Sequence, residues 1–478
     1  MSNYFVTSGG CTGFWLVVDT VPELTATIND AVLPNGATCD VAELHDSYQL
    51  DQACTIAADG LLYVATMSGV GRWVRRCLPS LEWSAQANWW INGTTGSDRA
   101  SGAGAGTPIK THAELVRRTG RLLGEGCASY TVRLAGAGFG GIDWTAIRAK
   151  HWPTLTYLGA RTVLYSGSVT ARTLYAVPPA APARGDMTDA AIPVSWTASG
   201  LLGKLFIGTA GTIAGRLGWI EKDLGAKTAG YNPPVHPGTY AFGDVTVADT
   251  FDVVELLPCG PLICPEGCTI WLYDLAFDGT ASPTWDVLRV TSESNVIATG
   301  CSFENGAAAV LGGSYFDAMA CRFASSSSVV IRMAGVFILD GSTLECTARA
   351  DPGATLEVYE AVTTWGRPAM AYAGQGPLQL FAGGWWGVFD MPLGSHGFQL
   401  SDEIAASAYI AGAFWGLFNA GTFGLYVCSG NVLRVAAWNL LGYGPNATND
   451  WYCAASTGLY AALPSAPANT LAGIVLAT

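Results

Sequence analysis

Apolar and polar positions repeat over residues 269–343 in a pattern that is typical of stacked β-strands. The segment Asn295-Val-Ile-Ala-Thr-Gly-Cys-Ser-Phe303 is echoed by Tyr315-Phe-Asp-Ala-Met-Ala-Cys-Arg-Phe323 and, more loosely, by Gly335-Val-Phe-Ile-Leu-Asp-Gly-Ser-Thr343. These copies place Cys301, Cys321 and Gly341 in register at one fixed step, and an earlier copy begins at Thr269, upstream of Asn295 by a slightly longer step. One such unit is too short to bury its own apolar side chains. The repeat therefore predicts a solenoid of short strands in which each coil buries the next.

The rest of the chain divides into a small N-terminal region, an entry region and an apolar end. Residues 1–86 hold short alternating apolar runs divided by turn signals such as Pro34-Asn-Gly36, which predicts one or two small β modules. Residues 87–128 hold an entry strand, a Gly-rich loop and one helix. We assign residues 129–358 to the coils, and residues 359–478 to a separately packed C-terminal region that trimerises or adds further coils.

The expected helix lies roughly over residues 112–123. Thr111 and Glu114 form a capping box at its start, and Ala113, Val116 and Leu122-Leu123 form its apolar side. A single short helix at this point is expected as an end cap, because the first coil would otherwise expose its apolar interior. His112, inside this helix, is expected to be structural.

The composition favours an oligomer. Hydrophobic residues make up 50% of the chain and charged residues only 13%, and 59 residues are Gly. Such a chain suits coils that are dry inside and that bury their outer faces against partner subunits. The net charge of −13 disfavours binding to nucleic acid and to anionic membrane surfaces.

The 13 cysteines are an odd number and have no zinc-finger spacing. Cys259, Cys264 and Cys268 are separated by four and three residues, with no His close by in sequence, so a metal site there is disfavoured. Cys301 and Cys321 share one position of the repeat, and we interpret them as small apolar core residues. A chain that folds in a reducing cytosol can carry such thiols.

Two features bear on localisation. The N-terminus has no basic region followed by an apolar run, so a secretory signal is not expected, and the protein would leave the cell by lysis or within a particle. Residues 404–433 carry no charge, which allows a membrane helix, but they also contain several Gly, Ser and Asn residues. We prefer buried strands to membrane insertion for this stretch.

The region around the expected helix resembles a known family. Trp89-Trp-Ile-Asn92, Gly96-Ser-Asp98, Gly102 and Thr107-Pro-Ile-Lys-Thr111 look like the entry motif of pectate-lyase-like right-handed parallel β-helix proteins. The stretch before them, residues 58–75, is similar to short modules that precede such helices in phage tail spikes and fibres. The resemblance implies an all-β fold, a homotrimer, an N-terminal segment that attaches to other particle proteins, and a solenoid that contacts surface polysaccharide.

Two carboxylates are the strongest candidates for chemistry. Asp278 follows Phe277 and Glu304 follows Phe303, so the repeat places both at one position on adjacent coils, with backbones about 5 Å apart. Such a pair raises one of its two pKa values, as an acid/base or nucleophile pair requires, or it holds a Ca²⁺ ion. The alternative is that both lie in turns and point into water. Nearby charges that would complete a groove are Asp274, Asp286, Arg289, Glu293, Asp317 and Arg322.

Aromatic side chains are a second kind of candidate, because their faces stack on sugar rings without needing charge. Trp271, Tyr273 and Trp285 lie on or beside the best-defined coils. Alternate residues of a strand share a face, so Trp271 and Tyr273 point to the same side. If that side is outward, they are candidate glycan-binding residues together with Arg289 and Arg322. The alternative is packing in the core or between subunits.

Three functions follow from these features. The first is a virion appendage, such as a phage tail spike or fibre, that binds host-surface glycan as a homotrimer and is released from the host cell with the particle. The second is a polysaccharide depolymerase, a hydrolase or lyase of the same fold, with Asp278 and Glu304 as its pair. The third is a purely structural virion protein.

Overall fold

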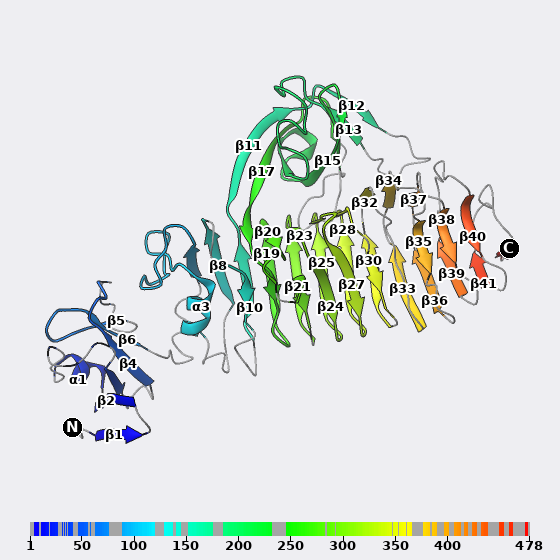
Figure 1. The fold of residues 1–478 in the computed structure, drawn as a ribbon. Helices are drawn as coiled ribbons and strands as arrows, with labels where there is room; N and C mark the ends of the chain where they lie inside the picture. Colours follow the sequence, from blue (N-terminus) through cyan, green and yellow to red (C-terminus); the bar gives the residue numbers. More distant parts are fainter. Residues whose placement is uncertain are drawn as a thin grey trace. The chain divides into compact units, whose positions relative to one another are not determined.

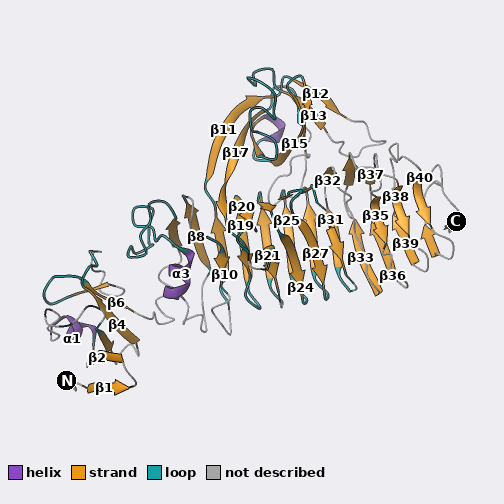
Figure 2. Cartoon of the chain, viewed as in Figure 1, coloured by secondary structure: helices purple, strands orange, loops and turns teal. Residues whose placement is uncertain are grey.

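The computed structural model shows a chain built mostly of β-strands, with few and short helices (Figure 2). It forms two compact units, Met1–Thr156 and Tyr157–Thr478. The all-β class expected from the sequence is confirmed. The residues that the structure describes are 4–8, 11–18, 20–26, 31, 33, 35, 37–41, 46–55, 58, 63–75, 88–119, 129–136, 140–144, 152–174, 185–231, 245–282, 284–291, 293–346, 348–351, 353–359, 361–365, 376–382, 385–389, 396–400, 406–412, 415–418, 423–427, 432–437, 449–453, 458–461 and 474–476.

The first unit opens with a mostly antiparallel sheet in the order β1-β2-β3-β4-β6-β5, beside a short helix. Its core is made by the buried side chains of Leu24, Cys39, Tyr48 and Trp73, which lie on both the helix and the sheet. The elements are β1 (Tyr4–Ser8), β2 (Cys11–Val18), α1 (Val21–Ala26), β3 (Thr38–Val41), β4 (Asp46–Asp51), β5 (Tyr63–Ala65) and β6 (Arg72–Arg75).

The second half of this unit holds the entry motif. Asp98 accepts hydrogen bonds at Oδ1 from the backbone N–H groups of Lys110 and Thr111, and at Oδ2 from the Thr111 hydroxyl. One carboxylate thus closes the Gly-rich loop and orients the residue that caps the next helix. The elements are β7 (Asn88–Asn92), α3 (His112–Thr119), β8 (Tyr130–Ala135), β9 (Ile142–Asp143) and β10 (Thr154–Leu158), of which β7 and β8 pair in parallel.

The expected helix is present as α3, and Thr111 Oγ1 accepts from the Glu114 N–H at 3.1 Å, as the capping box predicts. The prediction for Ala113 was wrong, because Ala113 is exposed while its neighbours His112 and Leu115 are buried. The His112 ring packs edge-on against Trp144 at 5.1 Å. Burial lowers the pKa of His112 to about 3 despite the nearby Asp143 charge, so the ring is neutral and structural.

From Leu262 to Trp365 the second unit places successive strands in three parallel sheets in a fixed order, and most of the described strands after Trp365 continue sheets 1 and 2 (Figure 1). Sheet 1 contains β19 (Thr269–Tyr273), β22 (Asn295–Thr299), β25 (Tyr315–Met319), β28 (Val336–Asp340), β31 (Thr355–Tyr359), β33 (Gly376–Ala382), β36 (Ala406–Gly412), β39 (Val432–Ala437), β41 (Gly458–Ala461) and β42 (Ile474–Leu476). Sheet 2 contains β20 (Leu275–Asp278), β23 (Ser302–Glu304), β26 (Arg322–Phe323), β29 (Thr343–Leu344), β32 (Ala361–Trp365), β34 (Trp385–Phe389) and β37 (Trp415–Phe418). Sheet 3 contains β18 (Leu262–Ile263), β21 (Asp286–Val290), β24 (Ala307–Leu311), β27 (Ser328–Arg332) and β30 (Ala348–Ala350).

The repeat register is correct for the first steps and wrong by one residue at the last. Thr269 pairs with Asn295 and Asn295 with Tyr315, as predicted. Tyr315, however, pairs with Val336 instead of Gly335, so the last step is one residue longer than the one before it. Cys321 accordingly lies opposite Ser342 instead of Gly341, and the Ser342 hydroxyl accepts from the Cys321 N–H at 3.0 Å.

The interior is lined by side chains that stack from one strand to the next. Phe303 lies flat against Phe277 on one side, with ring centroids 5.3 Å apart, and against Phe323 on the other, at 5.0 Å. The thiols of Cys301 and Cys321 are fully buried, which confirms their assignment to the core. Stacked apolar side chains of this kind hold each strand in register with the next.

The strands of the C-terminal third continue these sheets instead of packing separately from them. β31 pairs in parallel with β33, β33 with β36, and β36 with β39. Of the two alternatives expected for residues 359–478, this pairing favours further strands of the same series. A further parallel sheet consists of β35 (His396–Leu400), β38 (Phe423–Val427) and β40 (Asn449–Cys453). The uncharged stretch 404–433 contains strands, and none of the helices in the described residues has the length and apolar character needed to cross a membrane.

Residues 161–256 form an antiparallel module, which differs from the parallel coils expected over 129–358. Its hydrophobic core includes Trp196, Phe206, Tyr231 and Phe251. The two Pro-rich stretches that we interpreted as loops, 177–184 and 231–238, lie outside the described residues except for Tyr231. The elements are β11 (Arg161–Ser168), β12 (Ala171–Leu174), β13 (Gly185–Thr188), β14 (Leu205–Ala210), η3 (Gly211–Ile213), β15 (Leu217–Gly225), β16 (Thr228–Tyr231) and β17 (Thr250–Cys259).

Strand β17 joins this module to the parallel strands. Its first part pairs antiparallel with β11 and β14, and in Figure 1 β11 and β17 run side by side as one curved ribbon. Its last residues, Leu257–Cys259, pair in parallel with Leu275–Phe277 of β20. One continuous strand therefore fixes the position of the module on sheet 2.

Candidate functional site

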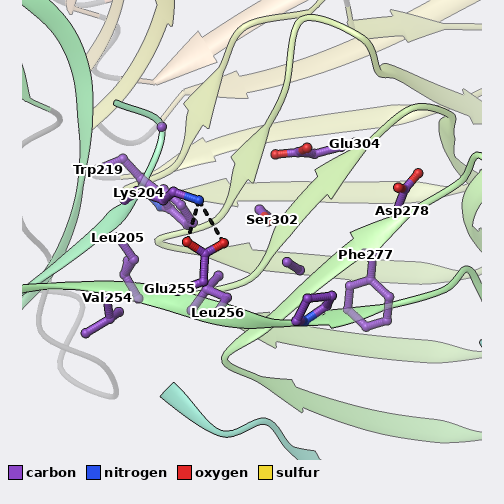
Figure 3. A pocket seen from close by; sticks show the side chains of 13 residues that line it. Lys204, Leu205, Trp219, Val254, Glu255, Leu256, Phe277, Asp278, Ser302 and Glu304 are labelled. Atoms are coloured by element: carbon purple, nitrogen blue, oxygen red, sulfur yellow. Dashed lines mark hydrogen bonds and ion pairs between the residues drawn. The ribbon is translucent and has the colours of Figure 1, made fainter. Parts of the chain in front are cut away.

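A pocket of about 200 Å³ lies where the antiparallel module meets sheet 2 (Figure 3). The module contributes residues of β14, β15 and β17, and sheet 2 contributes the ends of β20 and β23. The lining residues are Gly203, Lys204, Leu205, Trp219, Val254, Glu255, Leu256, Pro258, Ala276, Phe277, Asp278, Ser302 and Glu304. Both carboxylates singled out in the sequence, Asp278 and Glu304, belong to this lining.

The module wall is held in place by an apolar seam and one indole hydrogen bond. Leu205, Leu217 and Trp219 pack with Val254 and Leu256 against Ala320 of the parallel strands. The Trp219 Nε1–H donates to the Ala320 carbonyl at 2.7 Å. A buried indole that finds such an acceptor is both anchored and oriented, so this wall of the pocket is preformed.

Lys204 and Glu255 form an ion pair on the module side of the pocket. The Lys204 Nζ lies 2.8 Å from Glu255 Oε1 and 2.7 Å from Oε2, so the ammonium is shared by both carboxylate oxygens. Each side chain is partly exposed to solvent. The pair is therefore accessible, and it contributes polarity to the pocket but little net charge.

Asp278 lies at the end of β20 and is held by neutral donors. Its Oδ1 accepts from the backbone N–H of Thr280 at 2.8 Å, from the Thr280 hydroxyl at 2.6 Å and from the Asn305 amide at 3.1 Å. Burial alone would raise the pKa of Asp278, but these hydrogen bonds outweigh it and leave the pKa lowered. Asp278 is consequently ionised at neutral pH.

Glu304 lies directly opposite Asp278, on the neighbouring strand β23. Its Oε1 accepts from Arg322 Nη1 at 2.8 Å, and Arg322 also donates from Nε and Nη2 to the two oxygens of Glu345, at 2.7 and 2.8 Å. The Arg322 side chain is only 14% exposed. Arg322 thus positions Glu304 and is shared between two carboxylates.

The register prediction for Asp278 and Glu304 is confirmed, and of the two carboxyl groups Asp278 is not one whose pKa is raised. The two residues are paired on adjacent strands and line one pocket. In Figure 3 the Glu304 carboxylate extends toward the side on which Lys204 lies, and the Asp278 carboxylate lies at the opposite end. The pKa of Asp278 is shifted in the direction opposite to that of a proton donor, because its hydrogen bonds favour the charged form.

The aromatic candidates are not gathered at this pocket. Trp271 and Tyr273 alternate with buried Ile270 and Leu272 on β19, so they share the outward face of sheet 1, where Trp271 is 36% exposed. Trp285 is 59% exposed and lies in the turn before β21 of sheet 3. These aromatic candidates therefore lie on different sheets from the carboxylate pair.

The remaining charged candidates have local roles. Arg289 on sheet 3 pairs with Asp286 at 3.6 Å, and Asp274 pairs with Arg161 at 2.6 Å. Glu293 lies in the turn before β22, where its backbone N–H donates to the Gly312 carbonyl at 3.3 Å.

Asp317 is the one charged candidate of sheet 1 that is almost fully buried. It lies between the in-register residues Ile297 and Ile338 and is only 8% exposed. Burial, assisted by the Glu357 charge, raises the pKa of Asp317 to about 6. It does not line the pocket, so it takes no part in the site.

Sequence reasoning missed the module side of the pocket, namely Lys204, Trp219 and Glu255. These residues lie outside the repeat, so no register connected them to Asp278. One usable signal was present: Lys204 and Glu255 are charges within strand-like apolar runs of a chain that has few charges.

No protein-family model matches this chain, and no curated protein matches it in sequence. As for metals, no group of three or more His, Cys, Asp or Glu side chains in the described ranges is arranged to hold an ion. The chemistry of the site therefore has to be argued from the pocket itself. Carboxylates, a hydroxyl at Ser302 and an ammonium beside apolar walls offer hydrogen bonds to a ligand rich in hydroxyl groups.

Proposed function

We propose that this protein is a phage-type virion appendage with a right-handed parallel β-helix, which binds host-surface glycan as a homotrimer. The fold part of the proposal is supported by the fixed order in which residues 262–365 visit sheets 1, 2 and 3, with parallel pairing in each sheet. Crossover connections between parallel strands of one sheet are right-handed in nearly all proteins, which gives the proposed hand. The entry motif at residues 89–113 agrees with this family.

The observation that carries the binding part is the pocket between the module and sheet 2. Sugars present hydroxyl donors around apolar C–H faces. The pocket offers the matching surface: Asp278, Glu304 and Ser302 as acceptors, and the accessible side chains of Pro258 and Ala276 as apolar surface. Concave sites with apolar walls and a few convergent polar groups are the usual form of small-ligand pockets.

Trimerisation would make a weak site effective. Three copies of one pocket on a symmetric particle bind a repetitive polysaccharide with an avidity well above that of a single pocket. The N-terminal sheet of the first unit would attach the trimer to neighbouring virion proteins. Release from the host would occur with the particle.

A polysaccharide depolymerase is the second candidate, favoured by the adjacency of Asp278 and Glu304 in one pocket. In that case the ionised Asp278 would serve as base or nucleophile, because its lowered pKa rules it out as the acid at neutral pH. Glu304 would then have to donate the proton. A purely structural virion protein would need neither residue.

The test uses the purified full chain and polysaccharide extracted from candidate host cells. Surface plasmon resonance measures binding, and an assay of reducing ends measures cleavage. If the protein is an appendage, the unsubstituted chain binds the polysaccharide and releases no product. The double variant Asp278→Asn with Glu304→Gln then binds more weakly. A depolymerase releases oligosaccharides, and either substitution abolishes the release. Glu266→Gln, an exposed carboxylate in the turn after β18, is the matched control. Absence of both binding and release from the host on which the particle grows would leave the structural role.

A further inference from the structure

The pocket carries an excess of negative charge. Three carboxylates line it, those of Glu255, Asp278 and Glu304, against the single ammonium of Lys204. That ammonium is bound by both oxygens of Glu255, and Glu304 is paired with Arg322, which leaves Asp278 without a cation among the described residues. A carboxylate with no matching cation attracts positively charged ligands and repels negatively charged ones.

The surroundings of these two carboxylates do not remove that charge. The donors to Asp278 among the described residues, on Thr280 and Asn305, are neutral. Arg322 does pair with Glu304, but it makes two further bonds to Glu345, so one guanidinium faces two carboxylates. The cluster around Arg322 therefore keeps one negative charge, and Asp278 adds a second.

The volume limits the size of the ligand. At about 200 Å³ the pocket is smaller than the roughly 300–1,000 Å³ that encloses a drug-sized molecule. It accommodates one sugar ring and not a stretch of polymer. The module wall, fixed by the Trp219 hydrogen bond to the parallel strands, keeps this size from varying freely.

We infer that the pocket binds a single amino-sugar residue whose free ammonium group pairs with the Asp278 carboxylate, and that it rejects uronic acids. This inference rests on the proposed function, since it assumes that the pocket takes a sugar. The ring hydroxyls would be bound by Ser302 and the Lys204–Glu255 pair, and the apolar ring face would pack on Pro258 and Ala276. Such a residue would be a branch or an end of the host polysaccharide, because the pocket holds only one ring.

Methyl glycosides that differ in one substituent test this directly. The probes are the parent sugar, its 2-amino form, its 2-acetamido form and its uronate, each in the gluco and galacto series, titrated into the full chain at pH 7 by calorimetry and by saturation-transfer NMR. In one series the amino form should bind about tenfold or more tightly than the parent sugar, the usual gain from one charge-assisted contact, and the uronate should not bind. Added salt should reduce this preference.

Variants test whether the carboxylates cause the preference for the amino form over the parent sugar. Asp278→Asn combined with Glu304→Gln should remove the advantage of the amino form while the parent sugar still binds, and Glu266→Gln should change neither. Circular dichroism confirms that each variant is folded. Ser302→Ala is a second variant, which should weaken all glycosides alike without changing their ranking.

The outcomes separate this inference from the proposed function. Equal binding of amino and parent sugars, or tighter binding of the uronate, overturns the inference and leaves the proposed function standing. Binding of intact polysaccharide without binding of any single glycoside also overturns it, because the pocket is then not a one-ring site. Failure of both the glycosides and the intact host polysaccharide to bind refutes the proposed function itself.

Discussion

Single residues in this protein show how the surroundings of a carboxyl group decide its charge. Asp278 and Asp317 lie on neighbouring parallel sheets, yet the pKa of the first is lowered and that of the second is raised. Asp278 accepts three hydrogen bonds from neutral donors, whereas Asp317 lies between Ile297 and Ile338, and its Oδ1 has no hydrogen-bond partner among the described residues. The two residues should therefore affect stability in opposite ways.

Asp317→Asn should stabilise the protein at neutral pH. The folded-state pKa is raised from 3.8 to about 6, so the favourable contribution of the protonated form is complete below pH 3.8 and is lost as the pH rises through 6. Removing the charge should recover up to about 3 kcal/mol above pH 6, and nothing below pH 4. Thermal unfolding followed from pH 3 to pH 8 measures the difference.

Asp278→Asn is the matched comparison for this experiment. Its pKa is lowered, so the stability that it contributes is present at neutral pH and disappears as the pH falls through the folded-state pKa. The substitution should therefore destabilise the protein at pH 7 and have little effect in acid. Equal pH profiles for the two variants would contradict the assigned environments.

Phe303→Ala should be among the most damaging single changes in the parallel strands. The ring is fully buried and stacks on Phe277 and Phe323, so its loss leaves a cavity that neither neighbour can fill. Cavities of this kind cost about 3–5 kcal/mol. Trp285→Ala, which removes a larger but exposed side chain, is the control and should change the melting temperature little.

At the scale of elements, the sequence predicted the strands well and their partners only in part. The repeat identified β19, β20, β22, β23, β25 and β26 and their register, because buried Phe and Cys recur at fixed steps. The predicted register between β25 and β28 is wrong by one residue, because an extra residue in a turn does not change the pattern of apolar positions within the strands. The antiparallel module could not be predicted, because its pairings join segments that lie far apart in the chain and share no repeat, as Arg161 and Leu256 do.

Trp219→Phe should loosen the antiparallel module from the parallel strands. Phenylalanine keeps most of the buried ring but cannot donate to the Ala320 carbonyl, which would be left without its partner at a cost of about 1–3 kcal/mol. Hydrogen exchange should become faster along β14 and β15. Trp196→Phe, which removes a similar bond to the Lys227 carbonyl inside the module, should leave exchange at the Ala320 side unchanged.

At the scale of the whole molecule, the proposal of a particle-bound trimer is motivated by composition. The low content of charged residues and the net charge of −13 suit subunits that share large uncharged faces and repel other acidic surfaces. The sequence predicted part of the candidate site, because the repeat identified its two carboxylates. The opposite wall belongs to the antiparallel module, which only the structure revealed.

The proposed trimer predicts a mass in solution of three times the 49.9 kDa of one chain. Light scattering after size-exclusion chromatography measures this mass at physiological salt. A mass equal to that of a single chain at micromolar concentration would contradict the trimer, and with it the avidity on which cell binding is proposed to depend.

The paired strands β11 and β17 have an evolutionary consequence. They carry residues 161–256 out of the repeating framework and back at neighbouring points, so recombination could exchange this segment as one cassette with two crossovers. The framework would keep its own acidic residues, while each new cassette would supply a different lid above them. Under the proposed function, a lineage meeting a host with altered surface sugars would change what it recognises without altering its parallel sheets.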